Sequence, residues 1–82
     1  MPTRKLIGSE NLIGQNVVLY RKQRGMNQQM LLAQLQIRQI DINQSALSAL
    51  EGQQRKVSDR ELLALAQIFS VSVDDLFHPP KG

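Results

Sequence analysis

The side chains best suited to recognition chemistry lie in the stretch 43–51, which the sequence predicts to be one short helix. Gln44, Ser45 and Ser48 fall on its outer face, and residues 43–50 carry no charge. A glutamine can bond adenine N6 and N7 together, and a serine hydroxyl can bond several bases. This uncharged, hydrogen-bonding face favours insertion into the major groove of DNA. The alternative is an ordinary half-buried surface helix.

Few residues of the chain could support catalysis or bind a metal. There is no cysteine, which excludes disulfides and thiolate metal sites, and the single histidine, His78, lies in the C-terminal tail. No pair of carboxylates is set in a plausible cleft. We therefore expect no catalytic residues, no metal and no cofactor, and we do not expect an enzyme.

Charge is distributed unevenly along the 82 residues, whose net charge is +3. Basic residues outnumber acidic ones between Tyr20 and Arg60, and acidic residues prevail after Arg60. A basic middle suits a domain that presents one side to a polyanion. A solvated surface with uneven charge would give the same pattern.

The length and hydropathy predict one small domain with a single core. No apolar run is long enough to span a membrane. The basic segment 1–8 has too short an apolar part for a signal peptide, so we expect a flexible N-terminal arm there and a cytoplasmic protein without membrane contact.

Capping residues and apolar spacing predict the first two helices. Ser9 begins the first helix, whose apolar positions follow at helical spacing until Gly25 ends it. Asn27 is the N-cap of the second helix, which runs to Leu35. The first turn of the second helix has free N–H groups and no acidic residue, which suits phosphate binding. Gln28 and Gln29 add side-chain donors there.

The third helix, over 43–51, is predicted from its two ends. Asn43 is its N-cap, and Gly52 can end it in a left-handed conformation. Leu47 and Leu50 share its apolar face. Before it, the segment 36–42 is predicted to end the second helix and then form an extended connection that buries its isoleucines, which are Ile37, Ile40 and Ile42.

Two further helices complete the prediction. Ser58 and Glu61 form a capping box, and the fourth helix runs on to Phe69 with an apolar face of Leu62, Leu63, Leu65, Ala66 and Phe69. A last short helix over 72–77 precedes a C-terminal tail at 78–82. The sequence therefore predicts an all-α fold, a compact five-helix domain over 9–77 in which the second and third helices form a helix-turn-helix.

The chain resembles the small helix-turn-helix DNA-binding domains of the phage-repressor type, the Cro/C1 or XRE family, from Leu12 to Phe77. The order and spacing of several stretches carry this resemblance: Ile13-Gly14 to Tyr20-Arg21, Arg24-Gly25-Met26-Asn27-Gln28, Leu31 to Leu35, Ile42 to Leu47-Ser48, Leu50-Glu51, Glu61-Leu62-Leu63-Ala64-Leu65-Ala66, and Val71-Ser72-Val73-Asp74-Asp75-Leu76. The resemblance implies a lambda-repressor-like fold in a bacterial or phage protein.

The resemblance also implies roles for single residues. The second helix would cross the DNA backbone with Gln28 at its start, and the third helix would lie in the major groove. Arg21 and Glu51 occupy the positions of a partly buried ion pair that fixes the third helix. The candidate DNA-binding residues, including the basic loop after the third helix, are Asn27, Gln28, Gln29, Arg38, Gln39, Asn43, Gln44, Ser45, Ala46, Ser48, Arg55 and Lys56.

Two features depart from the common pattern of the family. Leu32 stands where many members have alanine, and the connection 36–42 is longer than usual and lacks glycine. The longer connection leaves open the angle between the second and third helices and whether Arg38 and Gln39 reach phosphates. For Arg55 and Lys56 the alternative is a solvated loop.

Two classes of function fit these observations. The first is a sequence-specific DNA-binding regulator, a repressor, that acts as a homodimer on a palindromic operator in double-stranded DNA. The second is a helical protein-interaction module on the same fold, like an antitoxin or an adaptor. An exposed apolar surface around Phe77 would favour the second, and Met30 and Phe77 could also serve dimerisation.

Overall fold

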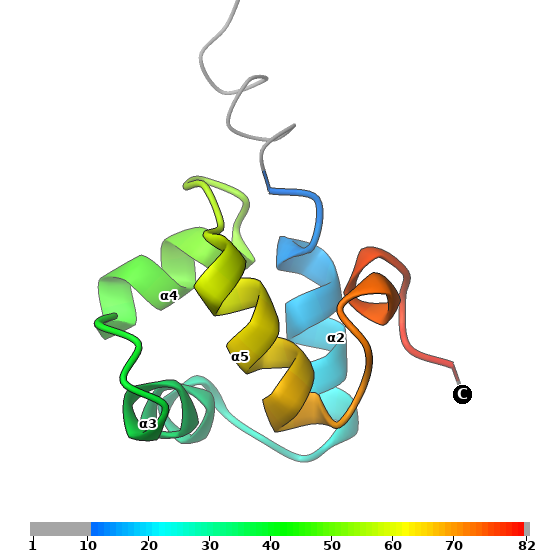
Figure 1. The fold of residues 1–82 in the computed structure, drawn as a ribbon, viewed down its shortest axis with the longest axis horizontal. Coiled ribbons are helices and arrows are strands. Elements are labelled where there is room, and N and C mark those ends of the chain that lie inside the picture. The colour runs from blue at the N-terminus through cyan, green and yellow to red at the C-terminus, as the bar shows by residue number, and fades with distance from the viewer. Residues whose placement is uncertain (1–10, 82) are drawn as a thin grey trace, which may run out of the picture.

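The computed structural model describes residues 11–81, and these form helices without any strand. The elements, in chain order, are α2 (Gly14–Gln23), α3 (Gln28–Ile37), α4 (Gln44–Glu51), α5 (Asp59–Phe69) and the 3-10 helix η1 (Asp74–Phe77) (Figure 1). The all-α prediction is confirmed. The count of five helices is only partly right, because the last one is a four-residue 3-10 helix.

The first described helix begins later than its sequence pattern predicted. Residues 11–13 are not helical, and α2 begins at Gly14. The side-chain Oδ1 of Asn11 accepts a hydrogen bond from the Gly14 N–H at 2.9 Å, so Asn11 satisfies a free donor at the helix start. The predicted cap Ser9 and the predicted arm 1–8 lie outside the described residues.

The predicted N-caps of the other three α-helices are confirmed. The Asn27 Oδ1 accepts from the Met30 N–H at 2.8 Å, and the Asn43 Oδ1 accepts from the Ala46 N–H at 2.8 Å. Ser58 starts α5 with both hydrogen bonds of its capping box in place. Each cap satisfies N–H groups that have no partner within the helix, and the start of each helix is thereby fixed.

The helix ends differ from the prediction because two glutamines adopt left-handed backbone conformations. Gly52 has φ −87°, so the predicted left-handed Gly52 is wrong, and Gln53 takes that conformation instead with φ 59°. The Gln54 N–H then reaches the Ala49 carbonyl at 2.7 Å and closes the last turn of α4. At the end of α3, Gln39 has φ 62° and serves the same purpose without a glycine.

The core is formed by one face of each described helix. Its buried apolar residues are Ile13, Val17, Tyr20, Leu31, Leu35, Ile40, Ile42, Leu47, Leu50, Ala64, Leu65, Ala66, Phe69 and Leu76. Two residues predicted to be buried are not: Ile37 is 70% exposed and Leu63 is 54% exposed. Each lies two residues from a buried leucine, about 200° around the helix, and therefore faces outward.

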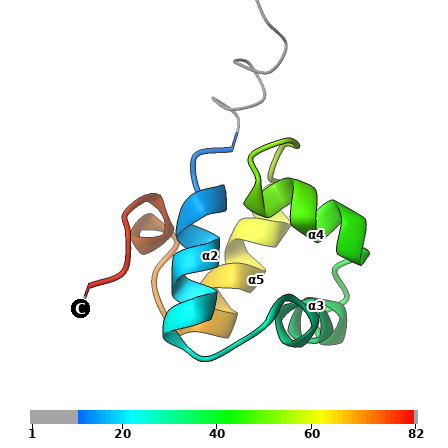
Figure 2. The ribbon, with the colours of Figure 1, turned by 180° about the vertical axis from the view of Figure 1, so that it is seen from behind.

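The helices form two groups around the central α5. In both views of the ribbon, α3 and α4 lie on one side, α2 and α5 in the middle, and η1 on the other side (Figures 1 and 2). Helix α5 packs against α2, α3 and η1, so it connects the two groups. No helix within residues 11–81 is long and apolar enough to cross a membrane.

An aromatic cluster attaches η1 and α5 to α2. The Tyr20 and Phe69 rings stack with centroids 5.5 Å apart, and the Arg24 guanidinium lies 5.1 Å from the centre of the Tyr20 ring. The Tyr20 hydroxyl donates to the Asp75 carbonyl at 3.0 Å. These contacts combine apolar burial with cation–π attraction and fix the side of the molecule away from α4.

Candidate nucleic-acid interface

Helix α4 presents the polar face that its sequence predicted. Gln44, Ser45 and Ser48 are exposed, while Ala46 is half-buried. Within residues 11–81, the side chains of Gln44 and Ser45 form no hydrogen bond. The opposite face is fully buried through Leu47 and Leu50, and Ile42 is buried just before the helix. The amphipathic pattern therefore sets the rotation of α4 about its own axis and points these side chains outward.

Glu51 holds the C-terminal end of α4 against two other helices. Its carboxylate accepts two hydrogen bonds from the Arg21 guanidinium, at 2.8 and 3.1 Å, and the Arg21 side chain is only 11% exposed. Arg21 also donates to the Met26 carbonyl at 3.0 Å in the turn before α3. Parallel hydrogen bonds between arginine and a carboxylate fix both position and orientation. The expected Arg21–Glu51 ion pair is therefore present and joins α2, the turn and α4.

Gln28 extends this network to the outer face of α4. Its Nε2 donates to Glu51 Oε1 at 2.8 Å, and its Oε1 accepts from the Ser48 hydroxyl at 3.1 Å. Both ends of the amide are thus used by α4, so the side chain has a single orientation. Two predicted DNA-binding residues, Gln28 and Ser48, lie in direct contact, and the start of α3 is joined to the middle of α4.

A close backbone contact between α2 and α4 supports the same arrangement. A Cβ atom at Gly14 would lie 2.4 Å from the Leu50 carbonyl oxygen, so only glycine fits there. Beside it, the Asn11 Nδ2 donates to the Leu50 and Arg55 carbonyls at 2.8 and 2.9 Å. Asn11 is 1% exposed, and it satisfies the carbonyls at the end of α4 and in the following loop.

The basic loop after α4 is held by a second ion pair. The Arg55 guanidinium donates to both carboxylate oxygens of Glu61, at 3.1 and 3.0 Å, and also to the Lys56 carbonyl at 3.0 Å. Burial raises the pKa of Glu61, but the hydrogen bonds from Arg55 and Ser58 outweigh it and hold the pKa below 4.5. Arg55 is thus engaged in positioning the start of α5, and its side chain is 32% exposed.

The remaining candidates lie at the two ends of α3. Asn27 and Gln29 are exposed at its start, where the first turn contains no acidic residue. Arg38 and Gln39 lie at the opposite end, and Arg38 donates to the Gln34 carbonyl and side chain at 3.2 and 2.9 Å. Ten helical residues separate the two ends by about 15 Å. The start of α3 contacts the outer face of α4 through Gln28, whereas Arg38 at the other end lines a hollow beside α5.

Asn11 helps to build this surface, but no signal in the sequence singles it out. A buried asparagine cannot be recognised from its neighbours, because its partners at Leu50 and Arg55 are about forty residues away. Among residues 11–81, no group of His, Asp or Glu side chains could hold a metal ion.

Comparison with known proteins agrees with this geometry. A family model described as a Cro/C1-type HTH DNA-binding domain matches residues 20–81. No curated protein and no solved structure matches the chain. The match covers α3, α4, α5 and η1, and thus both helices that form the polar surface. The chain therefore belongs to the Cro/C1-type helix-turn-helix family of DNA-binding domains.

Proposed function

We propose that this protein is a sequence-specific transcriptional repressor that reads its operator with α4. The main support is the uncharged face of Gln44, Ser45 and Ser48, on a helix whose position is fixed by Glu51. Side chains that must read base edges need a rigid support, because small displacements break bidentate hydrogen bonds. In the cytoplasm, the partner would be double-stranded DNA with a palindromic operator.

The proposed docking places α4 in the major groove and the start of α3 at the backbone. Asn27 and Gln29, and the unused donor of the Gln28 amide, would bond phosphate or sugar oxygens near the positive end of α3. Asn43 and Ala46 belong to the first turn of α4, beside Gln44. The loop with Arg55 and Lys56 would lie along the backbone beyond the other end of α4. Arg38 and Gln39 would be peripheral to this contact.

A homodimer would match the symmetry of a palindromic operator. Two copies would present their α4 helices about 34 Å apart, one helical turn of DNA. Because phosphate contacts release counterions, affinity would fall steeply as salt rises.

Selection from random-sequence duplexes, followed by salt titration of the selected site, tests this function. We expect a palindromic site to be enriched. Gln44→Ala combined with Ser48→Ala should reduce discrimination between specific and random DNA by about 100-fold, since each good base contact contributes about 1–3 kcal/mol. Gln15→Ala is the matched control, because Gln15 is an exposed residue of α2 outside this surface. Unchanged discrimination in the double variant would contradict the proposal.

The second candidate is a protein-interaction module on the same fold. It is favoured by exposed apolar side chains away from α4, with Leu63 54% and Phe77 41% exposed. Met30 is also 49% exposed, but it lies near the start of α3. Weak binding to DNA with no enriched sequence would favour this second function.

A further inference from the structure

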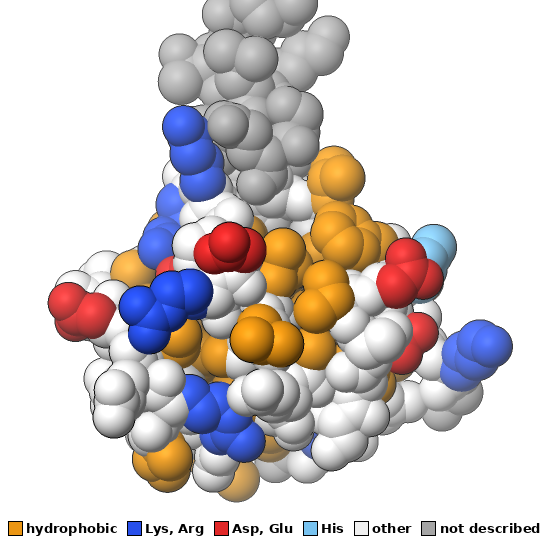
Figure 3. Space-filling model, in the orientation of Figure 1, with side chains coloured by type: hydrophobic (Ala, Val, Ile, Leu, Met, Phe, Trp, Pro, Cys, Tyr) orange, Lys and Arg blue, Asp and Glu red, His pale blue; other side chains and the backbone are white. Residues whose placement is uncertain are grey.

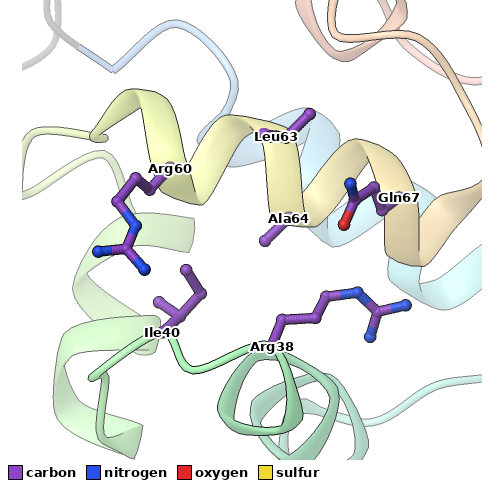
Figure 4. Close-up of a pocket in the computed structure, with 6 residues that line it drawn as sticks. All are labelled: Arg38, Ile40, Arg60, Leu63, Ala64 and Gln67. Atoms are coloured by element: carbon purple, nitrogen blue, oxygen red, sulfur yellow. The ribbon is translucent and has the colours of Figure 1, made fainter.

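An open groove separates α5 from the end of α3 and the connection that follows. It consists of two adjoining hollows of about 170 and 200 Å³ that share Ile40 and Arg60. Figure 4 shows Ile40 and Ala64 facing each other, with Arg60 on one side and Arg38 on the other. We refer to Arg38, Ile40, Arg60, Ala64 and Gln67 as the arginine groove.

The arginine groove has charge that the described residues leave unpaired. Within residues 11–81, Arg60 forms no hydrogen bond or ion pair, and Arg38 uses one of its terminal nitrogens for Gln34. Glu61 also borders the groove, but its carboxylate is occupied by Arg55 and Ser58. Asp41 lines the second hollow and reduces the positive charge there. The groove therefore suits a partner that places a carboxylate beside Arg60 and another beside Arg38.

An apolar surface continues from the groove across α5. Leu63 borders the first hollow from α5 (Figure 4) and is 54% exposed. The space-filling view shows hydrophobic side chains gathered over α5 and toward η1, with acidic side chains beyond them (Figure 3). A partner must therefore combine apolar contact with negative charge.

This chain itself carries such a surface, formed by η1 and the residue before it, which we call the acidic ridge: Val73, Asp74, Asp75 and Phe77. Val73 is 36% and Phe77 41% exposed, and the Asp74 side chain is 87% exposed. Within residues 11–81, the Asp74 carboxylate pairs only with His78, at 4.0 Å, and its high exposure makes it accessible. The groove lies on the α3 side of α5, and the ridge lies at η1 on the other side (Figure 1).

We infer that a second copy of this chain occupies the arginine groove with its acidic ridge, in a symmetric dimer. In a two-fold dimer each copy supplies both surfaces, so the groove-to-ridge contact forms twice. The two Leu63 side chains would then lie near the axis. The inference rests on the proposed function only because a palindromic operator requires a dimer. A partner seated in the groove would also leave Gln28 and Ser48 uncovered, since neither residue lines it.

Two other occupants fit the groove less well. Small-molecule sites usually bury most of the ligand surface, whereas both hollows are open to solvent. A DNA backbone would leave Leu63 uncovered and would approach the carboxylate of Asp41. Only a partner with apolar and acidic side chains matches all of these features.

Charge reversal on the full chain, without DNA, tests the dimer by sedimentation equilibrium. Arg60→Glu and Asp74→Arg should each raise the dimer dissociation constant by about tenfold or more, because like charges then meet at both contacts. The double variant should return to within about threefold of the original chain, since the opposite charges are restored with reversed sign. Lys22→Glu, on an exposed position of α2, is the control and should leave the dissociation constant unchanged.

A second substitution addresses the apolar centre. Leu63→Asp should raise the dissociation constant on the order of 100-fold, because two carboxylates would be buried against each other. Circular dichroism would verify that each variant is folded. A chain that stays monomeric at about 1 mM, or single reversals without effect, or a double variant that fails to recover, would overturn the inference.

The outcome separates this inference from the proposed function. A monomeric chain that still selects a DNA half-site would overturn the dimer and its palindromic operator, but would leave sequence reading by α4 standing. A dimer that behaves as described but selects no DNA sequence would overturn only the repressor function.

Discussion

The two arginine–glutamate pairs of this domain each form two hydrogen bonds, but they connect residues at very different separations in the sequence. Arg21 and Glu51 are 30 residues apart in sequence and join α2 to α4, while Arg55 and Glu61 are six residues apart and close the loop before α5. The first pair is nearly buried, and Arg55 of the second is 32% exposed. The comparison indicates that the first pair positions a helix and the second stabilises a helix start.

Removing the cation of the long-range pair should have the largest effect. Arg21→Ala leaves Glu51 buried with Gln28 as its remaining side-chain donor, which should lower the free energy of unfolding by about 3 kcal/mol. Urea denaturation measures this loss. Glu51→Gln is the companion variant, because its amide keeps a single acceptor oxygen and leaves the Arg21 cation without a counter-charge, so a loss of similar size is expected. Equal losses of less than about 1 kcal/mol in both variants would mean that the pair behaves like a surface ion pair.

The short-range pair should be weaker. Arg55→Ala should lower the free energy of unfolding by about 1 kcal/mol, because solvent already screens part of the interaction. The same urea experiment gives the value. DNA discrimination should change less in Arg55→Ala than in Arg21→Ala, since α4 keeps its own anchor. A larger loss of discrimination in Arg55→Ala would reverse the assigned roles.

The dependence of stability on pH distinguishes the ionisable Glu61 from an uncharged glutamine at the same position. Its pKa is held below 4.5 in the folded chain, so the ionised carboxylate stabilises the fold above the pKa of the unfolded chain. This contribution is lost as the pH falls through the folded pKa. The free energy of unfolding of Glu61→Gln should therefore vary less with pH below about 4.5. Urea titrations between about pH 3 and 7 measure the free energy of unfolding of both proteins. If it changed with pH in the same way in both, Glu61 would not be the source of the pH dependence.

The smallest effect is expected at the two left-handed glutamines that flank α4. Gln39→Gly should raise the free energy of unfolding by about 0.5 kcal/mol, since it removes left-handed strain but adds freedom to the unfolded chain. Gln53→Gly should give no gain, because the Gln53 side chain donates to the Asn11 carbonyl at 2.9 Å. Thermal unfolding of the two variants measures this difference. Equal gains in stability would mean that the hydrogen bond from Gln53 to Asn11 is weak.

Local signals in the sequence predicted most of this fold. They could not predict the contacts between residues that lie far apart in the sequence. The caps Asn27, Asn43 and Ser58 depend on neighbours within three residues, so their prediction needed no tertiary information. The exposure of Ile37 and Leu63 could not be read from composition, because it depends on how each helix rotates against the core.

The candidate surface shows the same division. The face of Gln44, Ser45 and Ser48 follows from helical spacing, whereas the Gln28 contacts with Glu51 and Ser48 depend on how α3 packs on α4. The ion pair of Arg21 with Glu51 came from the resemblance to the family and not from local pattern. The pairing of Arg55 with Glu61 was missed, since the basic loop suggested only solvent or phosphate.

The double engagement of Gln28 has a consequence for how binding preference can change during evolution. Substitutions at Gln44 or Ser45 alter exposed side chains that form no hydrogen bond to another helix within residues 11–81. A substitution at Ser48 also releases the amide oxygen of Gln28 and thereby changes the contact made by a second helix. Position 48 should therefore be coupled to position 28, and lineages that diverge at one should compensate at the other, while changes at positions 44 and 45 need no compensation in α3.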